Sequence, residues 1–475
     1  MTLFLAALAI CSGGAGVVAA SSGQRRKGLH RVALAAGFGL AIWSATFAAL
    51  LLCGFTSGPA RVVKDVVLAA AGAALWLRAR RGESALGPAA LDSAAIDPAA
   101  IDPAAIDPAA IDPAFDPAPR WLKRAFAAAC VLASALVVEH VLRFPDGGWD
   151  AWMIWNLRAR WIARAGPGFL SAFSPDLVFW AHQDYPWLVP GAVAQAFLAT
   201  GSEAYAIPAA LAWLFAALAV ALVTLTLAEL RGARVGLLGG LVLVTTPCLL
   251  AFTANQQSDV PMGAMLLLAT SALALALERD DARLLVLAGA GASMAAWTKN
   301  EGSVYALAIV ASLVLAGQGR AALRFLAGAL PGLALLVSFK LLVAHTNDLV
   351  HFTSGQTALD RALDLTRWGE LSLAWLRRIV YFQNWALWLP AFIVALAVAP
   401  RPLAKAPRVL LTALALGCAV YVPMYILQPH PLLWFFRASI DRMFTHLWPS
   451  AILATMLALH PGAAAAARPA PRPQG

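Results

Sequence analysis

The sequence predicts an all-α integral membrane protein with about 13 transmembrane helices. Composition is the first reason: 61% of the 475 residues are hydrophobic and only 13% are charged, whereas an ordinary globular domain carries about 25% charged residues. Patterning is the second reason, because long apolar runs such as 209–230 and 260–277 recur from end to end. Runs of about 18 or more apolar residues are long enough to cross a bilayer as helices.

Basic residues set the expected orientation of these helices. The formal net charge is +10, and the excess of lysine and arginine lies mostly in short loops such as 25–31, 78–81 and 401–408. Because such loops favour the cytoplasmic side, we expect the N-terminus outside and the C-terminus inside. The same explanation removes the need for a nucleic-acid partner. The first apolar run follows no basic residue and precedes RRK, so we expect an anchor rather than a cleaved signal peptide.

Four regions are expected along the chain. Residues 1–81 should form three membrane helices, and residues 120–460 a larger membrane domain. Between them, residues 82–119 contain the repeat AAIDP, whose proline at every fifth position forbids a continuous helix. Alanine and aspartate also supply too little apolar surface for the repeat to fold alone. We therefore expect a disordered cytoplasmic linker there, and a cytoplasmic tail at 461–475.

Polar clusters gather in the loops that lack basic residues. They lie within 145–190, 255–263, 297–303, 344–356 and 437–449, and the expected orientation places all five on the outer face. Charged side chains at helix ends are costly unless they face water or one another, and they are functional by default. Lysine and arginine would hold a phosphate, and carboxylates would act on hydroxyls as a general base. The pattern indicates a ligand with an anionic head and a lipid tail.

The stretch PDGGWDAWMIWNLRARWIARAG, at 145–166, is the most unusual of these segments. Two glycines favour a turn, and a helix is expected at 149–164, lying in the headgroup layer at the outer face. We expect one apolar stripe on this helix, made of Trp149, Trp152, Trp155, Ala159 and Ile162. An interfacial anchor explains the tryptophans and arginines, but it does not explain Asp146 and Asp150.

Each remaining polar cluster has a simpler alternative. Asp259 precedes an apolar helix and would suit a plain N-cap. Lys299, Asn300 and Glu301 would suit a tight outer turn. The segment His182–Tyr185 would suit a solvated loop, and Asp441 with Arg442 an exposed pair. The sequence alone does not decide between these alternatives and a functional site.

Together the polar segments resemble a known family. Along the chain these segments are DGGWDAW, WNLRARWI, HQDYPWLVP, SDVPMG, WTKNEG and SIDRMFTHLWP. This order, with its spacing and common face, resembles the bacterial GT-C class of polytopic glycosyltransferases over roughly residues 121 to 460. That class includes the lipid A aminoarabinose transferases and the protein mannosyltransferases.

The resemblance implies a reaction and a location. A sugar would pass from a polyprenyl-phosphate or polyprenyl-diphosphate carrier to a glycan, lipid or protein acceptor. The enzyme would be a multi-pass protein of the bacterial inner membrane, with membrane lipid around it and its active site on the periplasmic side. A divalent cation is possible, because two aspartates could hold one, although nearby lysine and arginine could replace it.

The resemblance also assigns roles to residues. Asp150 is the first choice for the catalytic base and Asp146 the second, while Asp259 matches a second acidic position. Lys299 matches a lysine expected near the carrier phosphate. The full candidate set is catalytic Asp150, Asp146 and Asp259, with substrate-binding His182, Asp184, Tyr185, Lys299, Asn300, Glu301, Asp441 and Arg442.

Two other classes of function compete with the enzyme. A flippase or transporter of lipid-linked sugars would place its polar residues near the middle of the membrane and in broken helices. A non-catalytic assembly subunit would keep the shape but not need the acidic pair. The gathering of polar residues at one face, with both aspartates present, favours the transferase.

Overall fold

The structure is a computed structural model of the chain, and it describes residues 1–21, 29–84, 118–177, 182–344, 357–382, 385–386, 388–428 and 431–461. Most of the expected linker at 82–119, the loop 345–356 and most of the expected tail at 461–475 lie outside the described residues. The fold is all-α, as predicted. The two short strands, β1 (Tyr381–Phe382) and β2 (Trp385–Ala386), pair antiparallel.

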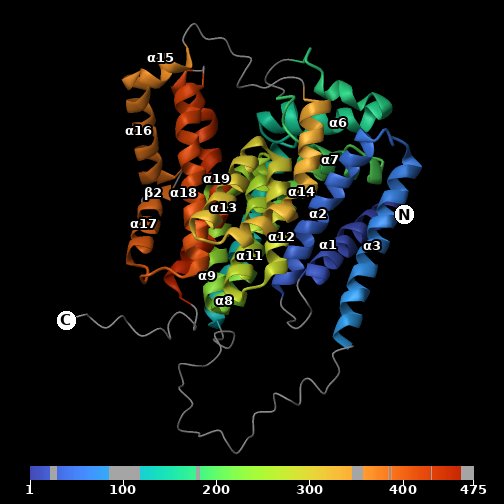
Figure 1. Cartoon of the computed structure of the whole chain (residues 1–475). Coiled ribbons are helices and arrows are strands. Elements are labelled where there is room, and N and C mark those ends of the chain that lie inside the picture. The colour runs from blue at the N-terminus through green and yellow to red at the C-terminus, as the bar shows by residue number, and fades with distance from the viewer. Residues whose placement is uncertain are drawn as a thin grey trace, which may run out of the picture.

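The helices follow one another closely along the chain (Figure 1). The first half of the chain holds α1 (Thr2–Ser21), α2 (His30–Leu52), α3 (Gly58–Ser84), α5 (Arg120–Arg143), η5 (Ala151–Trp155), α6 (Asn156–Ala165), η6 (Gly166–Phe173), α7 (Leu188–Thr200) and α8 (Ala206–Arg231). The second half holds α9 (Ala233–Val244), α10 (Pro247–Ala254), α11 (Asp259–Arg279), α12 (Ala282–Thr298), α13 (Asn300–Leu315), α14 (Gly319–Leu342), α15 (Ala358–Leu363), α16 (Leu365–Val380), α17 (Trp388–Val398), α18 (Lys405–Leu427) and α19 (Leu432–Leu459).

Seven of the described helices are long and apolar enough to cross a membrane: α1, α2, α5, α8, α11, α14 and α18. An eighth crossing results if α9 and α10, which are bent by 56°, form one broken span. The shorter apolar helices are α7, α12 and α13. The expected total of about 13 is reached when these three, α3 and α19 also cross. The difference arises because breaks and charges divide apolar runs that looked continuous in sequence.

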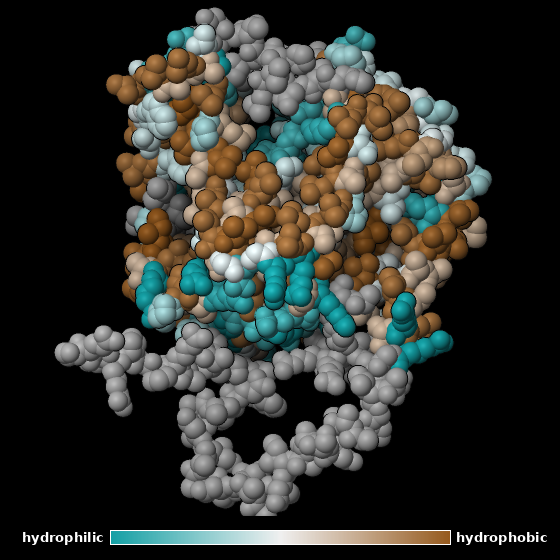
Figure 2. Space-filling view, in the orientation of Figure 1, coloured by the Kyte–Doolittle hydropathy of each residue, from teal (hydrophilic) through white to brown (hydrophobic). Residues whose placement is uncertain are grey.

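Helix α11 is the centre of the bundle. Its residues from Asp259 to Leu277 are all buried, and it packs against α8, α12 and α19. A helix of 21 residues is about 31 Å long, so its two ends lie on opposite sides of a membrane-sized layer. We call the end that carries Asp259 the site end, and the end that carries Arg279 the far end. Figure 2 shows a broad hydrophobic band on the molecule, with hydrophilic residues gathered below it.

The far end is fastened by ion pairs between helix termini. Arg231, the last residue of α8, binds Glu278 of α11 with N–O distances of 3.0 and 3.1 Å. Glu229 binds Arg279 and lies 3.2 Å from the Nδ1 atom of His30, the first residue of α2. The far end therefore gathers the ends of α8 and α11 with the beginning of α2.

The three N-terminal helices pack as part of the same helical body. The Ser44 hydroxyl of α2 donates to the Leu188 carbonyl of α7 at 2.7 Å, and Phe38, Trp43 and Phe47 are buried in the main core. Helix α2 also contacts α8 and α11. The regions 1–81 and 120–460 are therefore separate in the sequence, but their helices pack against each other.

The helix expected at 149–164 forms, but its single apolar stripe does not. Trp155, Ala159 and Ile162 are buried, whereas Trp149 and Trp152 are about half exposed. The reason is the π-helix η5, whose wider turn rotates the residues before it out of register with those of α6. The expectation of one continuous stripe was wrong. Figure 1 shows α6 across the upper end of the bundle.

Candidate functional site

The segment that carries Asp150 is held against the loop before α11. Gly147 has a positive φ of 76°, and a Cβ atom there would lie 2.8 Å from the Asn255 carbonyl oxygen. The Gln256 side-chain amide donates to the Pro145 carbonyl at 3.0 Å. A glycine is therefore required where the chain turns so close to a neighbouring backbone, and the turn brings Asp150 to the site end.

Asp150 forms a two-pronged ion pair with Arg442 of α19. The two guanidinium nitrogens donate to the two carboxylate oxygens at 2.6 and 3.0 Å. Asp150 is buried, while the Arg442 side chain is 26% exposed. Asp146, four residues earlier, is exposed and has no hydrogen-bond or ion-pair partner within the described ranges. The two aspartates of one short loop thus have opposite environments.

Asp259 is fully buried at the start of α11 and joins three elements. Its Oδ1 atom accepts a hydrogen bond from Lys299 Nζ at 2.8 Å and lies 2.6 Å from His446 Nε2. The N-cap position is occupied by Ser258, so Asp259 is not a simple cap. It connects the α12–α13 junction, where Lys299 lies, to the middle of α19.

Lys299 is only 2% exposed and lies among carboxylates. Burial by itself disfavours the ammonium, but the Asp259 and Glu301 carboxylates more than offset that effect and raise the pKa of Lys299 above its ordinary value. Its Nζ atom lies 2.8 Å from Asp259 and 3.4 Å from Glu301. The predicted triplet at 299–301 is therefore part of a charged cluster, not a plain polar turn.

A second cluster forms around Asp184. Its Oδ2 atom accepts a hydrogen bond from the Asn300 amide at 2.7 Å and lies 3.3 Å from Lys340 Nζ. Lys340 also donates to the Asn300 side-chain oxygen at 2.8 Å. The Lys340 side chain is 33% exposed, so this cation reaches the surface of the site.

Tyr185 connects the two clusters. Its ring stacks on Trp155 with a centroid distance of 5.5 Å and on His182 with a distance of 4.9 Å. Lys299 Nζ lies 5.7 Å from the centre of the same ring. His182 has a positive φ of 47°, and its carbonyl accepts a hydrogen bond from Arg158 at 3.0 Å. The loop 182–187 is thus packed into the site end.

Asp441 and Arg442 do not pair with each other. Asp441 lies 3.0 Å from Arg378 Nε of α16, whereas Arg442 binds Asp150. The alternative of an exposed neighbouring pair is therefore incorrect. Both residues connect α19 to other elements of the site end.

His446, Lys340 and Arg378 also lie at the site, although they were not predicted from the sequence. A signal existed for two of them. His446 is four residues after Arg442 and so lies on the same helix face, and Lys340 is the one charged residue between Arg324 and Asp348 in the sequence. Arg378 lies in an amphipathic helix rich in arginine, and its neighbours in sequence gave no sign of its contact with Asp441.

Several buried polar atoms of the site end have no partner within the described residues. They include Asp259 Oδ2, His446 Nδ1, Asp184 Oδ1 and Glu301 Oε2. Buried polar atoms are nearly always hydrogen-bonded, so each such atom calls for an explanation. No three His, Cys, Asp or Glu side chains of the described residues are grouped as metal ligands would be. The carboxylates of this site are instead matched with lysine, arginine and histidine.

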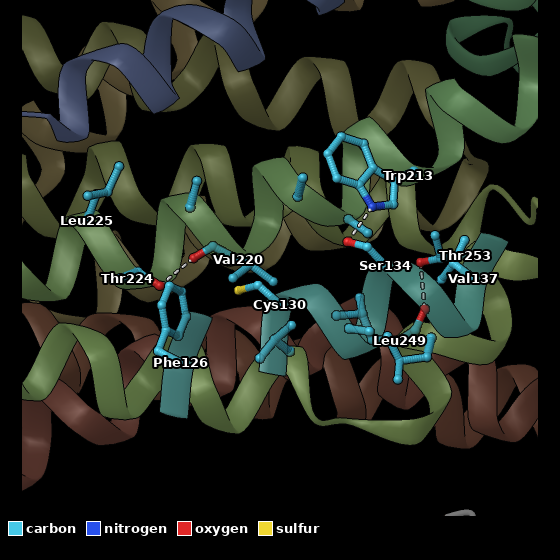
Figure 3. Close-up of a pocket in the computed structure, with 16 residues that line it drawn as sticks. Phe126, Cys130, Ser134, Val137, Trp213, Val220, Thr224, Leu225, Leu249 and Thr253 are labelled. Atoms are coloured by element: carbon cyan, nitrogen blue, oxygen red, sulfur yellow. Dashed lines mark hydrogen bonds between the residues drawn. The ribbon is translucent and has the colours of Figure 1, made fainter. Parts of the chain in front are cut away.

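An apolar groove of about 350 Å³ begins near this site and follows the bundle. It is lined by α5, α8, α9 and α10, and Figure 3 shows Phe126, Val137, Val220, Leu225 and Leu249 around it. Its lining includes one hydrogen bond between side chains, from Trp213 to Ser134 at 3.0 Å. Val137 and Thr253 lie within one turn of the His140–Asn255 contact of 3.0 Å that leads to the Asp150 loop.

Comparison with known proteins agrees with the resemblance. Residues 183–345, about a third of the chain, match the family described as dolichyl-phosphate-mannose-protein mannosyltransferase. No curated protein and no solved structure matches the chain. The matched range includes Asp184, Asp259, Lys299 and Lys340. The expected resemblance to GT-C glycosyltransferases is therefore confirmed, and it supports a multi-pass membrane glycosyltransferase.

Proposed function

We propose that the chain, which resembles membrane glycosyltransferases of the GT-C type, transfers a sugar from a polyprenyl-phosphate carrier to a hydroxyl of a glycan, lipid or protein. The reaction takes place at the site end, on the periplasmic side of a bacterial inner membrane. The observation that carries this proposal is the two-pronged contact between Asp150 and Arg442 beside the Asp259–Lys299–His446 cluster. This arrangement places a carboxylate that can act as a general base next to cations that can bind a phosphate.

The proposed reaction is one direct displacement. The acceptor oxygen attacks the anomeric carbon, and the bond between that carbon and the phosphate oxygen breaks. The acceptor proton passes to the Asp150 carboxylate, and the electron pair leaves with the carrier phosphate. A single displacement inverts the anomeric configuration. The phosphate is a good leaving group only when cations neutralise its charge.

Arg442 controls when Asp150 can act as the base. Both Asp150 oxygens are occupied by the Arg442 guanidinium, so neither faces an acceptor hydroxyl while this ion pair is intact. A carrier phosphate would compete for the same guanidinium, which is partly exposed and binds phosphate in the same two-pronged way. Binding of the donor would thus release Asp150 next to the leaving group. Asp146, which has no such partner, is the weaker candidate.

The other charged residues divide into outer and inner positions. Lys340 and Arg442 are partly exposed and would contact the phosphate directly. Lys299 is almost inaccessible, so it would not touch the phosphate. Its positive charge, which lies behind Asp259, would instead stabilise the phosphate at a distance. Asp259 and His446 hold that charge in place. Asp184 and Asn300 orient Lys340.

The remaining candidates would shape the rim of the site. Tyr185 and His182 present stacked rings of the kind that packs against the apolar face of a sugar. Glu301 balances Lys299, and Asp441 fixes Arg378.

The apolar groove supplies a place for the carrier tail. Helix α5 is mostly exposed in the bundle, so the groove between α5 and α8 opens toward lipid (Figure 3). An isoprenoid chain would be held in it by van der Waals packing, because moving the chain from lipid into an apolar groove removes no surface from water. The head of a lipid bound there would lie beside the docked 145–150 loop.

The test is transfer of labelled sugars from synthetic polyprenyl-phosphate donors in proteoliposomes. Asp150→Asn keeps the shape but cannot accept a proton, so turnover should fall by about 10² to 10⁴, the usual worth of a general base. Donor binding should persist, because the phosphate is held by Arg442 and Lys340. The matched control is Asp146→Asn in the same loop, which should retain most of its turnover.

Three outcomes would contradict the proposal. Loss of transfer in Asp146→Asn with normal transfer in Asp150→Asn would reverse the assignment. Normal transfer in both variants would leave the stretch as an interfacial anchor. Movement of the labelled donor across the bilayer without transfer by the unmodified chain would indicate a flippase.

A further inference from the structure

A separate polar network lies where α3 packs against α2 and α7. Lys64 Nζ donates to Asp65 Oδ1 at 2.6 Å and to the Gln195 side-chain oxygen at 2.7 Å. The Trp43 indole donates to the same Asp65 oxygen at 3.1 Å, and Gln195 donates to the Trp43 carbonyl at 2.9 Å. The charges of Lys64 and Asp65 neutralise each other. The network therefore joins α2, α3 and α7 and carries no net charge.

Arg61, one turn before Lys64, has no such partner. Its side chain makes no hydrogen bond or ion pair with any residue that the structure describes, although it is only partly exposed. A guanidinium carries five N–H donors and is always charged. The nearest carboxylate, Asp65, is occupied by Lys64 and Trp43. The region therefore keeps one unmatched positive charge.

Arg61 borders a pocket of about 170 Å³ between α1, α2, α3 and α7. Polar groups of Arg61, Asp65 and Gln195 form part of its lining, and aliphatic side chains such as Leu5 and Leu198 form another part. A ligand that fits such a lining has an anionic group at one end and a hydrocarbon portion at the other.

The position of Arg61 in the bundle supports an anionic partner. Helix α2 begins with His30 at the far end and is 23 residues long, or about 34 Å. Helix α3 therefore starts near the site end and carries Arg61 there, while Arg78 lies near its other end. In the proposed function, on which this step rests, the site end faces outward, and lysine and arginine are less common in outer loops than in cytoplasmic ones. An unpaired arginine at this level is explained if a local anion holds it.

We infer that this pocket binds the phosphate headgroup of an anionic phospholipid of the membrane. Arg61 donates to the phosphate oxygens in its two-pronged geometry. The acyl portion lies against Leu5 and Leu198, and the lipid joins α3 to α7. This site is distinct from the proposed transfer site, because none of its lining residues belongs to the Asp150 or Asp259 clusters.

The experiment uses the purified full chain in a neutral detergent. Phosphatidylglycerol, phosphatidylcholine or inorganic phosphate is added, and bound lipid is counted by native mass spectrometry while Tm is followed. Phosphatidylglycerol should be retained and should raise Tm, because a ligand that binds only the folded state stabilises it. Arg61→Gln should weaken its retention by about tenfold, as expected for the loss of a charge-assisted hydrogen bond. The matched control is Arg78→Gln, on the same helix.

A second variant keeps the inference testable if Arg61→Gln does not fold. Leu198→Trp fills the pocket without changing its charge, and it should also abolish retention. Equal retention of phosphatidylcholine, or a normal response in either pocket variant, would overturn the inference. A Tm rise with inorganic phosphate alone that matches the lipid would overturn the assignment to a lipid and leave a simple anion site.

Discussion

The two ends of the helix bundle use the same residue types for different purposes. At the far end, Arg231 donates to both oxygens of Glu278 and to the Leu230 carbonyl at 2.9 Å. At the site end, Lys299 is equally inaccessible and binds Asp259 at a similar distance. Here, however, Asp259 Oδ2 and His446 Nδ1 have no hydrogen-bond partner among the described residues, whereas His30 Nδ1 at the far end, which also makes no hydrogen bond, lies 3.2 Å from Glu229.

The difference shows how a structural ion pair is told from a functional one. Unsatisfied buried polar atoms destabilise a fold, so they persist where another function requires them. The far end has helix termini joined by matched charges, which suits a fastening. The site end has spare acceptors, partly exposed cations and a neighbouring apolar groove, which suits a ligand.

Among substitutions that distinguish the site end from the far end, Asp259→Asn should reduce turnover the most. The amide keeps the shape, but it no longer holds the Lys299 ammonium and the His446 ring by charge. Turnover should fall by about 10² to 10³, the usual cost of losing one preorganised electrostatic group. Initial-rate measurements in proteoliposomes give this value. Glu278→Gln, at the far end, should leave turnover per folded molecule unchanged. An equal loss in both variants would break the comparison.

A smaller effect is expected for Lys340→Gln. This change removes a partly exposed cation that Asp184 and Asn300 position. We expect kcat/KM for the lipid-linked donor to fall about tenfold, which corresponds to about 1.4 kcal/mol, with most of the change in KM. Steady-state kinetics over a range of donor concentrations measure it. A change in kcat alone would place Lys340 in the chemical step instead.

The smallest effect is expected at an exposed pair outside both ends' clusters. Arg164 binds Glu203 at 2.6 and 2.8 Å, and these hydrogen bonds hold the pKa of Glu203 below its ordinary value. Any contribution of the pair is therefore complete at neutral pH and is lost as the pH falls through the lowered pKa. Because exposed pairs contribute little, Arg164→Gln should leave Tm and turnover unchanged within error at pH 7. A clear loss would mean that the loop at Glu203 serves the site.

Sequence reasoning predicted the all-α class and several of the residues that meet at the site end. Hydropathy and loop charge are local properties, so they could place Asp150, Asp259 and Lys299 at the same level of the bundle. They could not predict that Asp150 would pair with Arg442, because nothing local specifies a contact across 292 positions. The stripe around Trp152 failed for a related reason, since a π turn depends on tertiary packing.

The partners of the site were the hardest part to foresee. His446 lies in an apolar segment, where a lone histidine is most simply a core residue. Only the fold shows that its ring reaches Asp259. The joining of α2 to α7 through Ser44 was hidden as well, because an apolar helix in sequence does not reveal which neighbour it packs against.

The most direct test of the central claim compares Lys299→Met with Arg231→Met. Both changes remove an almost inaccessible cation from a paired carboxylate, one at each end of the bundle, and both should destabilise the fold, since unpairing a buried charge costs about 3–5 kcal/mol. The measurement is turnover per folded molecule, with Tm recorded in parallel. The account predicts that Lys299→Met loses at least about 10² in turnover, while Arg231→Met stays within about twofold of the unmodified enzyme. Equal turnover losses in the two variants would contradict it.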